Sequence, residues 1–302
     1  MRSLPARRVG PCIKARYRLV ALFLLPVLIP GANAQLQRST NISRELFGVV
    51  LQRSSNQLLE QVERMYGKPV RTERFDNASR PDCLRYAESD VEEDGTPVIR
   101  VGEHIRPTEN VIVHELFHLK LQAEGYPGAI SWEWPREEMT SGNQAYTALL
   151  FDHVFSEIVH WVFYPEMRQM GFYPQLVVMN ELAEAFETGI RVGTNADTRA
   201  LYYLKFALHV QDESVRARLR NIYQQNGWEE GLVLGEKLVG AITGANPRTR
   251  EEILAVFLRC INLLTEGVVR FDFRGWEKRV LGSHDQVVAV IRINPIRRNR
   301  VP

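Results

Sequence analysis

Cysteine is scarce in this chain and is never paired at short spacing. The 302 residues contain three cysteines, Cys12, Cys83 and Cys260, and no C-x-x-C motif. A zinc site built from thiolates, or a dithiol redox motif, needs such close pairs, so the sequence argues against both. Cys12 lies in a segment that we expect to be removed. The other two cysteines either form one disulfide or remain buried thiols, and both alternatives stay open.

Long hydrophobic runs are also missing. The longest apolar stretch, residues 19–30, is shorter than the roughly 20 residues that a membrane-spanning helix needs. It follows a basic stretch that ends at Arg18 and precedes an A-x-A pattern that ends at Ala34. These features predict a signal peptide, residues 1–34, with cleavage after Ala34 and export to the periplasm or the medium. We expect no stable membrane span after cleavage, and an uncleaved anchor is the alternative.

No excess of positive charge remains once that segment is set aside. Of the 38 basic and 36 acidic residues, six basic and no acidic residues lie in residues 1–34, which leaves a net charge of −4 for the remainder. Such a remainder gives no reason to expect nucleic-acid binding. With 45% hydrophobic and 25% charged residues, the chain has the composition of a soluble globular protein. Nothing in the composition bears on the oligomeric state.

The first half of the chain predicts helices next to a small sheet. Residues 39–66 have the apolar spacing of a helix, and Gly67 is a stop signal. β-like segments on either side of an Asp-Gly turn at residues 94–95 predict a hairpin or small sheet. A further helix should begin after Thr108, a good N-cap residue, and run to about Ala123.

The second half of the chain predicts mainly helix. Residues 126–143 look like a loop, and a helix over about 144–164 should end at Pro165. Later helical patterns include a segment that starts at Thr249 with a capping box. His209 lies in another apolar helical stretch, where we expect an ordinary buried histidine. The predicted fold class is therefore α+β and helix-rich.

One motif carries specific chemistry. His114 and His118 lie four residues apart with Glu115 beside the first, which is the pattern H-E-x-x-H. On a helix, residues four apart lie one turn above each other, so both imidazoles can bind one metal ion and the glutamate can take a proton from a water held there. The flanking residues are mostly apolar, which indicates a buried helix whose polar side chains need partners. A hydrogen-bonded polar cluster without metal is the alternative.

This segment resembles the active-site helix of the zincin metallopeptidases. The resemblance implies zinc as the cofactor, His114 and His118 as its ligands, and Glu115 as the general base. It covers about ten residues, among them the apolar Val111. The chain departs from the family pattern at Lys120, where an apolar residue is expected. The third histidine that follows shortly in the metzincin subgroup is missing, so that subgroup is excluded.

The patterns along the chain and the resemblance together predict an architecture. We expect a zincin-like fold with a small β-hairpin or sheet before the motif helix and a mostly helical C-terminal half. The length of the chain suits one large domain or two small ones, and we expect a single metallohydrolase domain over residues 35–294, followed by a basic tail over residues 295–302.

The third metal ligand should come from the predicted helix of about 144–164. At 100° per residue, the polar residues His153, Glu157 and His160 fall within an arc of about 100° on this apolar helix, with Tyr164 on the same side. We favour His160 as the ligand, with Glu157 orienting an imidazole from behind. The gluzincin subgroup instead has a glutamate ligand, which matches Glu157, but its aspartate four residues later is absent. His153 is the remaining candidate. Unbound members of this set, or Tyr164, could stabilise a developing oxyanion.

The predicted function is an exported zinc metallopeptidase that hydrolyses a peptide or protein substrate. Two alternatives remain open. The pairs Glu115-x-x-His118 and Glu157-x-x-His160 match ligands of a di-iron or di-manganese carboxylate bundle. A non-catalytic metal-binding protein would carry the same motif. The substrate, the cleavage preference and the endo or exo mode follow from none of these patterns.

Overall fold

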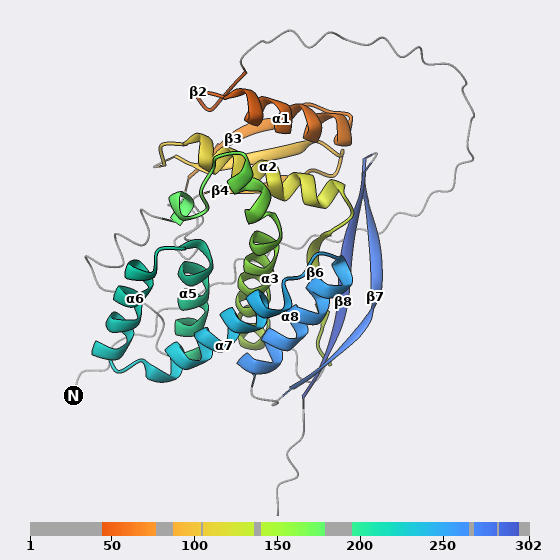
Figure 1. The fold of residues 1–302 in the computed structure, drawn as a ribbon. Coiled ribbons are helices and arrows are strands. Elements are labelled where there is room, and N and C mark those ends of the chain that lie inside the picture. Colours follow the sequence, from red (N-terminus) through yellow and green to blue (C-terminus); the bar gives the residue numbers. More distant parts are fainter. Residues whose placement is uncertain are drawn as a thin grey trace, which may run out of the picture.

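The computed structural model describes residues 44–76, 87–103, 105–135, 140–178, 195–265, 269–282 and 284–295. The predicted signal peptide, Cys83 and the basic tail beyond Pro295 lie outside these ranges. Within them, no helix combines the length and apolar character that crossing a membrane requires. The arrangement of helices and small sheets confirms the predicted α+β, helix-rich class (Figure 1).

The N-terminal part contains a three-stranded sheet next to two helices. The strand order is β3-β5-β4, with β5 parallel to β3 and antiparallel to β4, so β4 is an edge strand. Helix α1 packs against α2, and α2 packs against β4 and β5. In chain order these elements are β1 (Glu45–Leu46), β2 (Val49–Val50), α1 (Arg53–Tyr66), β3 (Arg71–Phe75), β4 (Ala87–Val91), β5 (Pro97–Gly102) and α2 (Glu109–Ala123).

Local signals placed most boundaries of this part correctly. The predicted hairpin is β4–β5, and Gly95 of its turn has a φ of 88°. Gly67 ends α1 in the left-handed conformation, as expected. The predicted start of that helix at residue 39 was wrong, because the described chain before Arg53 forms the short hairpin β1–β2. Gly48, at the turn of this hairpin, has a φ of 81°, which is incompatible with a continuous helix.

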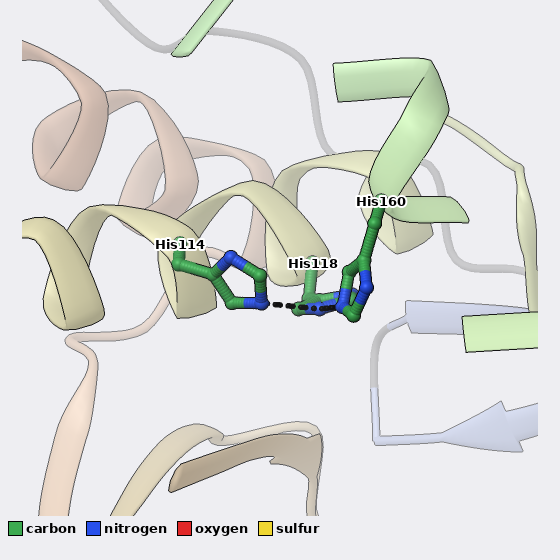
Figure 2. A group of neighbouring side chains, drawn as sticks. All are labelled: His114, His118 and His160. Carbon is green, nitrogen blue, oxygen red and sulfur yellow. Dashed lines mark hydrogen bonds between the residues drawn. The ribbon is translucent and has the colours of Figure 1, made fainter. Parts of the chain in front are cut away.

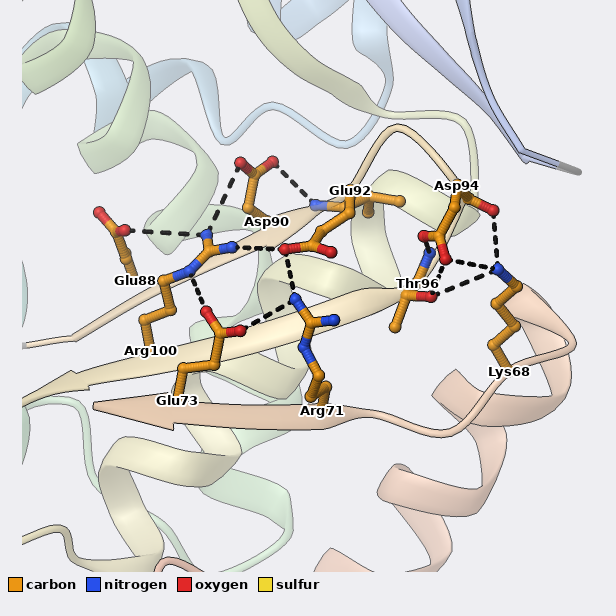
Figure 3. Close-up of polar contacts among 10 residues, drawn as sticks. Lys68, Arg71, Glu73, Glu88, Asp90, Glu92, Asp94, Thr96 and Arg100 are labelled. Atoms are coloured by element: carbon orange, nitrogen blue, oxygen red, sulfur yellow. Dashed lines mark hydrogen bonds and ion pairs between the residues drawn. The ribbon is translucent and has the colours of Figure 1, made fainter. Parts of the chain in front are cut away.

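The face of the β3-β5-β4 sheet that points away from α2 carries a network of ion pairs (Figure 3). Arg100 of β5 lies at the centre of this network. Its Nε atom lies 2.8 Å from Oε2 of Glu73 in β3, and its Nη2 atom lies 3.0 Å from Oε1 of Glu92, just after β4. Its hydrogen bond holds the pKa of the Glu73 carboxyl below its usual value. Because side chains alternate along a strand, this charged face directs Ser89 of β4 to the opposite face, toward α2.

The C-terminal part is larger and combines helices with a second sheet. The strand order is β6-β8-β7, with β6 parallel to β8 and β7 antiparallel to β8. Helix α3 packs against α5, α7, α8 and β6, and one hydrophobic core continues from α1 to β8. These elements are β6 (Pro127–Glu133), α3 (Ser141–Gln169), α5 (Ala196–His209), α6 (Glu213–Gln225), α7 (Glu229–Ala245), α8 (Arg250–Leu264), β7 (Val269–Leu281) and β8 (His284–Pro295).

The structure corrects two predictions in this part and adds a C-terminal hairpin that the sequence did not predict. The expected loop of 126–143 contains β6, whose partner β8 lies about 160 residues later and gives no local signal. The mostly helical C-terminal half ends in the long hairpin β7–β8. Helix α3 does not end at Pro165 but continues to Gln169. Proline removes one backbone N–H from the helix. In the turn before it, the guanidinium of Arg248 donates a hydrogen bond to the carbonyl of Val162 at 3.0 Å.

Helix α7 approaches α5 closely through a glycine. A Cβ atom at Gly235 would lie 2.8 Å from the ring of Tyr203, which is 2% exposed and cannot move aside. We predict that Gly235→Ala lowers the free energy of unfolding by about 1–3 kcal/mol, through overpacking. Gly240 of the same helix is exposed and has open space around its Cβ position. As the matched control, Gly240→Ala should stabilise by roughly 0.5–1 kcal/mol. Urea unfolding measures both, and equal effects would contradict the packing argument.

Candidate metal centre

The motif helix α2 is buried along nearly its whole length. Thr108 accepts a hydrogen bond from the backbone N–H of Val111, which confirms the predicted N-cap. Every residue from 111 to 117 is buried, so the polar side chains of this stretch cannot be hydrated by solvent. The unexpected Lys120 is also buried, and its Nζ lies 2.6 Å from both carboxylate oxygens of Glu166 in α3. The departure from the family pattern is therefore an ion pair between the two ligand-bearing helices.

Three imidazoles converge at the crossing of α2 and α3 (Figure 2). The Nε2 atom of His118 lies 3.3 Å from Nε2 of His114 and 3.0 Å from Nε2 of His160. All three nitrogens lie within 4.8 Å of one another, although His160 follows His118 by 42 residues. His114 and His160 are 4% and 8% exposed, and His118 is half-buried. The structure thus brings the two motif histidines together with the third ligand that we favoured from the sequence.

The spacing of these nitrogens fits a tetrahedral ion. Zinc binds imidazole nitrogen at about 2.0–2.1 Å, so two nitrogens of one tetrahedral zinc are separated by about 3.3 Å. The observed separations of 3.3 and 3.0 Å are close to this value. Hydrogen bonds alone satisfy such a group poorly, because a neutral imidazole offers only one proton for its two nitrogens. Three histidines with one position left for water or substrate form the ligand set of a catalytic zinc site.

Burial keeps His114 and His160 in the neutral form that a metal ion requires. Desolvation is the largest cause that lowers the pKa of His114 well below its ordinary value, followed by the neighbouring imidazoles His160 and His118. Desolvation also lowers the pKa of His160 to about 3, with a smaller contribution from the positive charge of Lys205. Neutral imidazoles retain the lone pairs that a cation requires.

Glu157 lies behind His160 rather than among the three nitrogens. Its Oε2 atom accepts a hydrogen bond from Nδ1 of His160 at 3.3 Å and lies 3.5 Å from Nδ1 of His209 in α5. The carboxylate is 3% exposed. Glu157, His160 and His209 also lie close enough to hold an ion among themselves. The nitrogens of His209, however, are hydrogen-bonded to the Lys205 carbonyl and the Tyr164 hydroxyl. The position of Glu157 therefore suits an orienting role better than a ligand role.

Glu115 is held by the neighbouring sheet. It is 5% exposed, and the hydroxyl of Ser89 in β4 donates to its Oε2 atom at 2.8 Å. A buried carboxylate needs such a donor, and one donor fixes one of its two oxygens. The edge strand thus positions the proposed base in the same helical turn as His114. No sequence signal points to this contact, because residues 89 and 115 belong to different elements.

Two other candidates offer no group to the three nitrogens. His153 is not part of either cluster of possible ligands among the described residues. It precedes His160 by two helical turns, a rise of roughly 10 Å. Tyr164 is fully buried, and its hydroxyl is hydrogen-bonded to His209. The predicted role of Tyr164 in oxyanion stabilisation therefore loses its support, since this hydroxyl has a partner inside the core.

His209 is the residue that sequence reasoning undervalued. It is 1% exposed and contacts both Glu157 and Tyr164, the two residues that flank His160 on α3. Burial is the main cause that lowers its pKa to about 3. Its apolar helical context was correctly interpreted as core. Only the fold shows that this part of the core adjoins the metal centre.

Metal content separates the ligands from their support. We predict that His160→Ala weakens zinc binding by more than the roughly 10–100-fold that loss of an outer hydrogen-bond partner costs, whereas Glu157→Ala falls within that range. His153→Ala, on the same helix, should retain one zinc per chain and serves as the control. Elemental analysis after dialysis, with chelator competition for affinity, measures all three. If Glu157→Ala loses zinc as completely as His160→Ala, the carboxylate is a ligand.

The chain was compared with family models, curated proteins and solved structures. None of the three comparisons gives a match. The geometry of the centre itself must therefore carry any functional conclusion.

Proposed function

We propose that this chain is a zinc-dependent metallopeptidase, exported by its N-terminal segment. The observation that carries the proposal is the convergence of three imidazole Nε2 atoms, two of whose separations (3.3 and 3.0 Å) are close to those around a tetrahedral zinc, with a buried glutamate in the same helical turn. A three-histidine set leaves one coordination position for the reaction, whereas a structural site is closed by four protein ligands. The zincin resemblance of the motif supports hydrolysis of peptide bonds.

The side chains of this chain have distinct tasks in the proposed reaction. When bound, zinc lowers the pKa of a bound water to about 7 and polarises a carbonyl group. Glu115 takes a proton from the attacking water while the oxygen of that water forms a bond to the peptide carbon. When the carbon–nitrogen bond then breaks, Glu115 passes that proton to the leaving amine. The hydrogen bond from Ser89 holds the carboxylate in one orientation during both transfers.

A di-iron or di-manganese carboxylate site receives less support. Such a site needs glutamates among the ligands of both metals. Within the described ranges, neither cluster of possible ligands contains Glu115, and Glu157 faces His160 Nδ1 and His209. The packing of α2 against a sheet also differs from a bundle whose core is lined by helices alone. A non-catalytic metal-binding protein remains compatible with the same geometry, and the experiment below distinguishes it.

Replacing the proposed base tests the mechanism. We predict that Glu115→Gln lowers the hydrolysis of a fluorogenic peptide library by about 10²–10⁴-fold, because the amide cannot take the proton. Zinc content should be unchanged, since Glu115 is not a ligand in this proposal. Glu124→Gln, at the exposed end of α2, is the matched control and should keep full activity.

Two outcomes would contradict the proposal. Undiminished turnover by Glu115→Gln would remove this residue from the mechanism. A wild-type protein that holds one zinc per chain but hydrolyses no member of the library would favour the non-catalytic alternative.

A further inference from the structure

His160 and three other buried side chains form a compact group. Glu157, His160 and Tyr164 come from one face of α3, at positions i, i+3 and i+7, and His209 comes from α5. Their exposed fractions are 3%, 8%, 0% and 1%. Four polar side chains in so dry a place must satisfy one another, because water does not do so. The pattern of their hydrogen bonds therefore determines which nitrogen of each imidazole carries the proton.

The two nitrogens of His209 are both assigned by their neighbours. Nδ1 lies 2.8 Å from the backbone carbonyl of Lys205, and a carbonyl oxygen can only accept, so Nδ1 carries the proton. Nε2 then has the lone pair and accepts the hydroxyl of Tyr164. A protonated Nδ1 cannot bind a metal. The Glu157–His160–His209 cluster is therefore a hydrogen-bonded support and not a second metal site.

The same reasoning extends to His160. With Glu157 Oε2 as the acceptor 3.3 Å away, Nδ1 carries the proton and Nε2 keeps its lone pair. Nε2 is the atom that meets His118 and His114. The ring of Tyr164 stacks on the ring of His160, with centroids 5.7 Å apart at 12°, while its hydroxyl reaches His209. Carboxylate and tyrosine thus restrain both the proton and the ring plane.

We propose that His209 is a positioning residue, which holds Glu157 and Tyr164 so that His160 presents a lone pair to the metal. This inference rests on the proposed metal centre and not on peptide hydrolysis. It gives α5 a role in a site to which it contributes no ligand. Because His209 Nδ1 donates to the Lys205 carbonyl of its own helix, α5 places the edge of this imidazole against the carboxylate of Glu157, at 3.5 Å. Outer partners of this kind orient a metal-binding histidine and raise its basicity.

Zinc affinity of the full-length protein, measured by competition with a chromogenic chelator, tests this role. We predict that His209→Phe, which keeps an aromatic ring without hydrogen bonds, weakens zinc binding about 10–100-fold. His209→Asn can restore a donor in place of Nδ1 and should recover most of the affinity. Tyr164→Phe should weaken binding less, since it keeps the stacked ring. Tyr223→Phe is its matched control, because Tyr223 is equally buried but donates to the carbonyl of Arg199, away from this group.

The outcomes separate this inference from the proposed function. Unchanged affinity in both His209→Phe and Tyr164→Phe would overturn the positioning role alone. Equal loss in Tyr164→Phe and Tyr223→Phe would also overturn it, as a general effect of stability. A wild-type protein that binds no zinc would contradict both the proposed metal centre and this inference. Weakened binding in His209→Phe with recovery in His209→Asn supports the role, even if no peptide is cleaved. Cobalt(II) in place of zinc gives a visible spectrum that should change in His209→Phe and be restored in His209→Asn.

Discussion

The crossing of α2 and α3 is the constraint on which the candidate site depends. Two of the three nitrogens belong to one helix and the third to the other, so a small shift between the helices would separate them. Two contacts next to the site hold this crossing. The rings of Phe117 and Phe163 stack in parallel at 5.3 Å, and Lys120 forms its ion pair with Glu166. Phe163 also packs edge-on against His118 at 5.1 Å. Core packing and ligand geometry are thus set by the same residues.

Support for the three imidazoles is unequal. His160 has a carboxylate behind it and a tyrosine ring against its face, so both its proton and its plane are restrained. Nδ1 of His114 is buried and has no hydrogen-bond partner within the part of the chain that the structure describes. Its ring is restrained by packing, with Phe163 at 5.2 Å. His160, which is separated from the motif by 42 residues, thus has more hydrogen-bonded support than His114.

Local sequence signals predicted the structural features that neighbouring residues determine. The cap at Thr108, the capping box at Thr249 and the Asp-Gly turn were all found because each depends on neighbouring residues. The polar stripe on α3 likewise indicated which face of that helix approaches the motif. What the sequence could not supply were partners fixed by packing alone. Ser89, His209 and the parallel pairing of β6 with β8 all join segments that are far apart in the chain.

In the proposed centre, such long-range assembly would couple metal binding to folding. The ligand nitrogens converge only when α3 lies on α2, so an ion that binds them stabilises the folded chain and not the unfolded one. A metal present at a hundred times its dissociation constant would add about 2.7 kcal/mol to the free energy of unfolding, a large share of the roughly 5–15 kcal/mol of an ordinary domain. Lys120 is buried, and its ion pair with Glu166 joins the same two helices without metal. The Glu166 side chain is half-exposed, and Lys120 also lies 3.6 Å from Glu124, so this cation has two carboxylate partners. The pairing therefore stabilises the crossing whether or not an ion is bound.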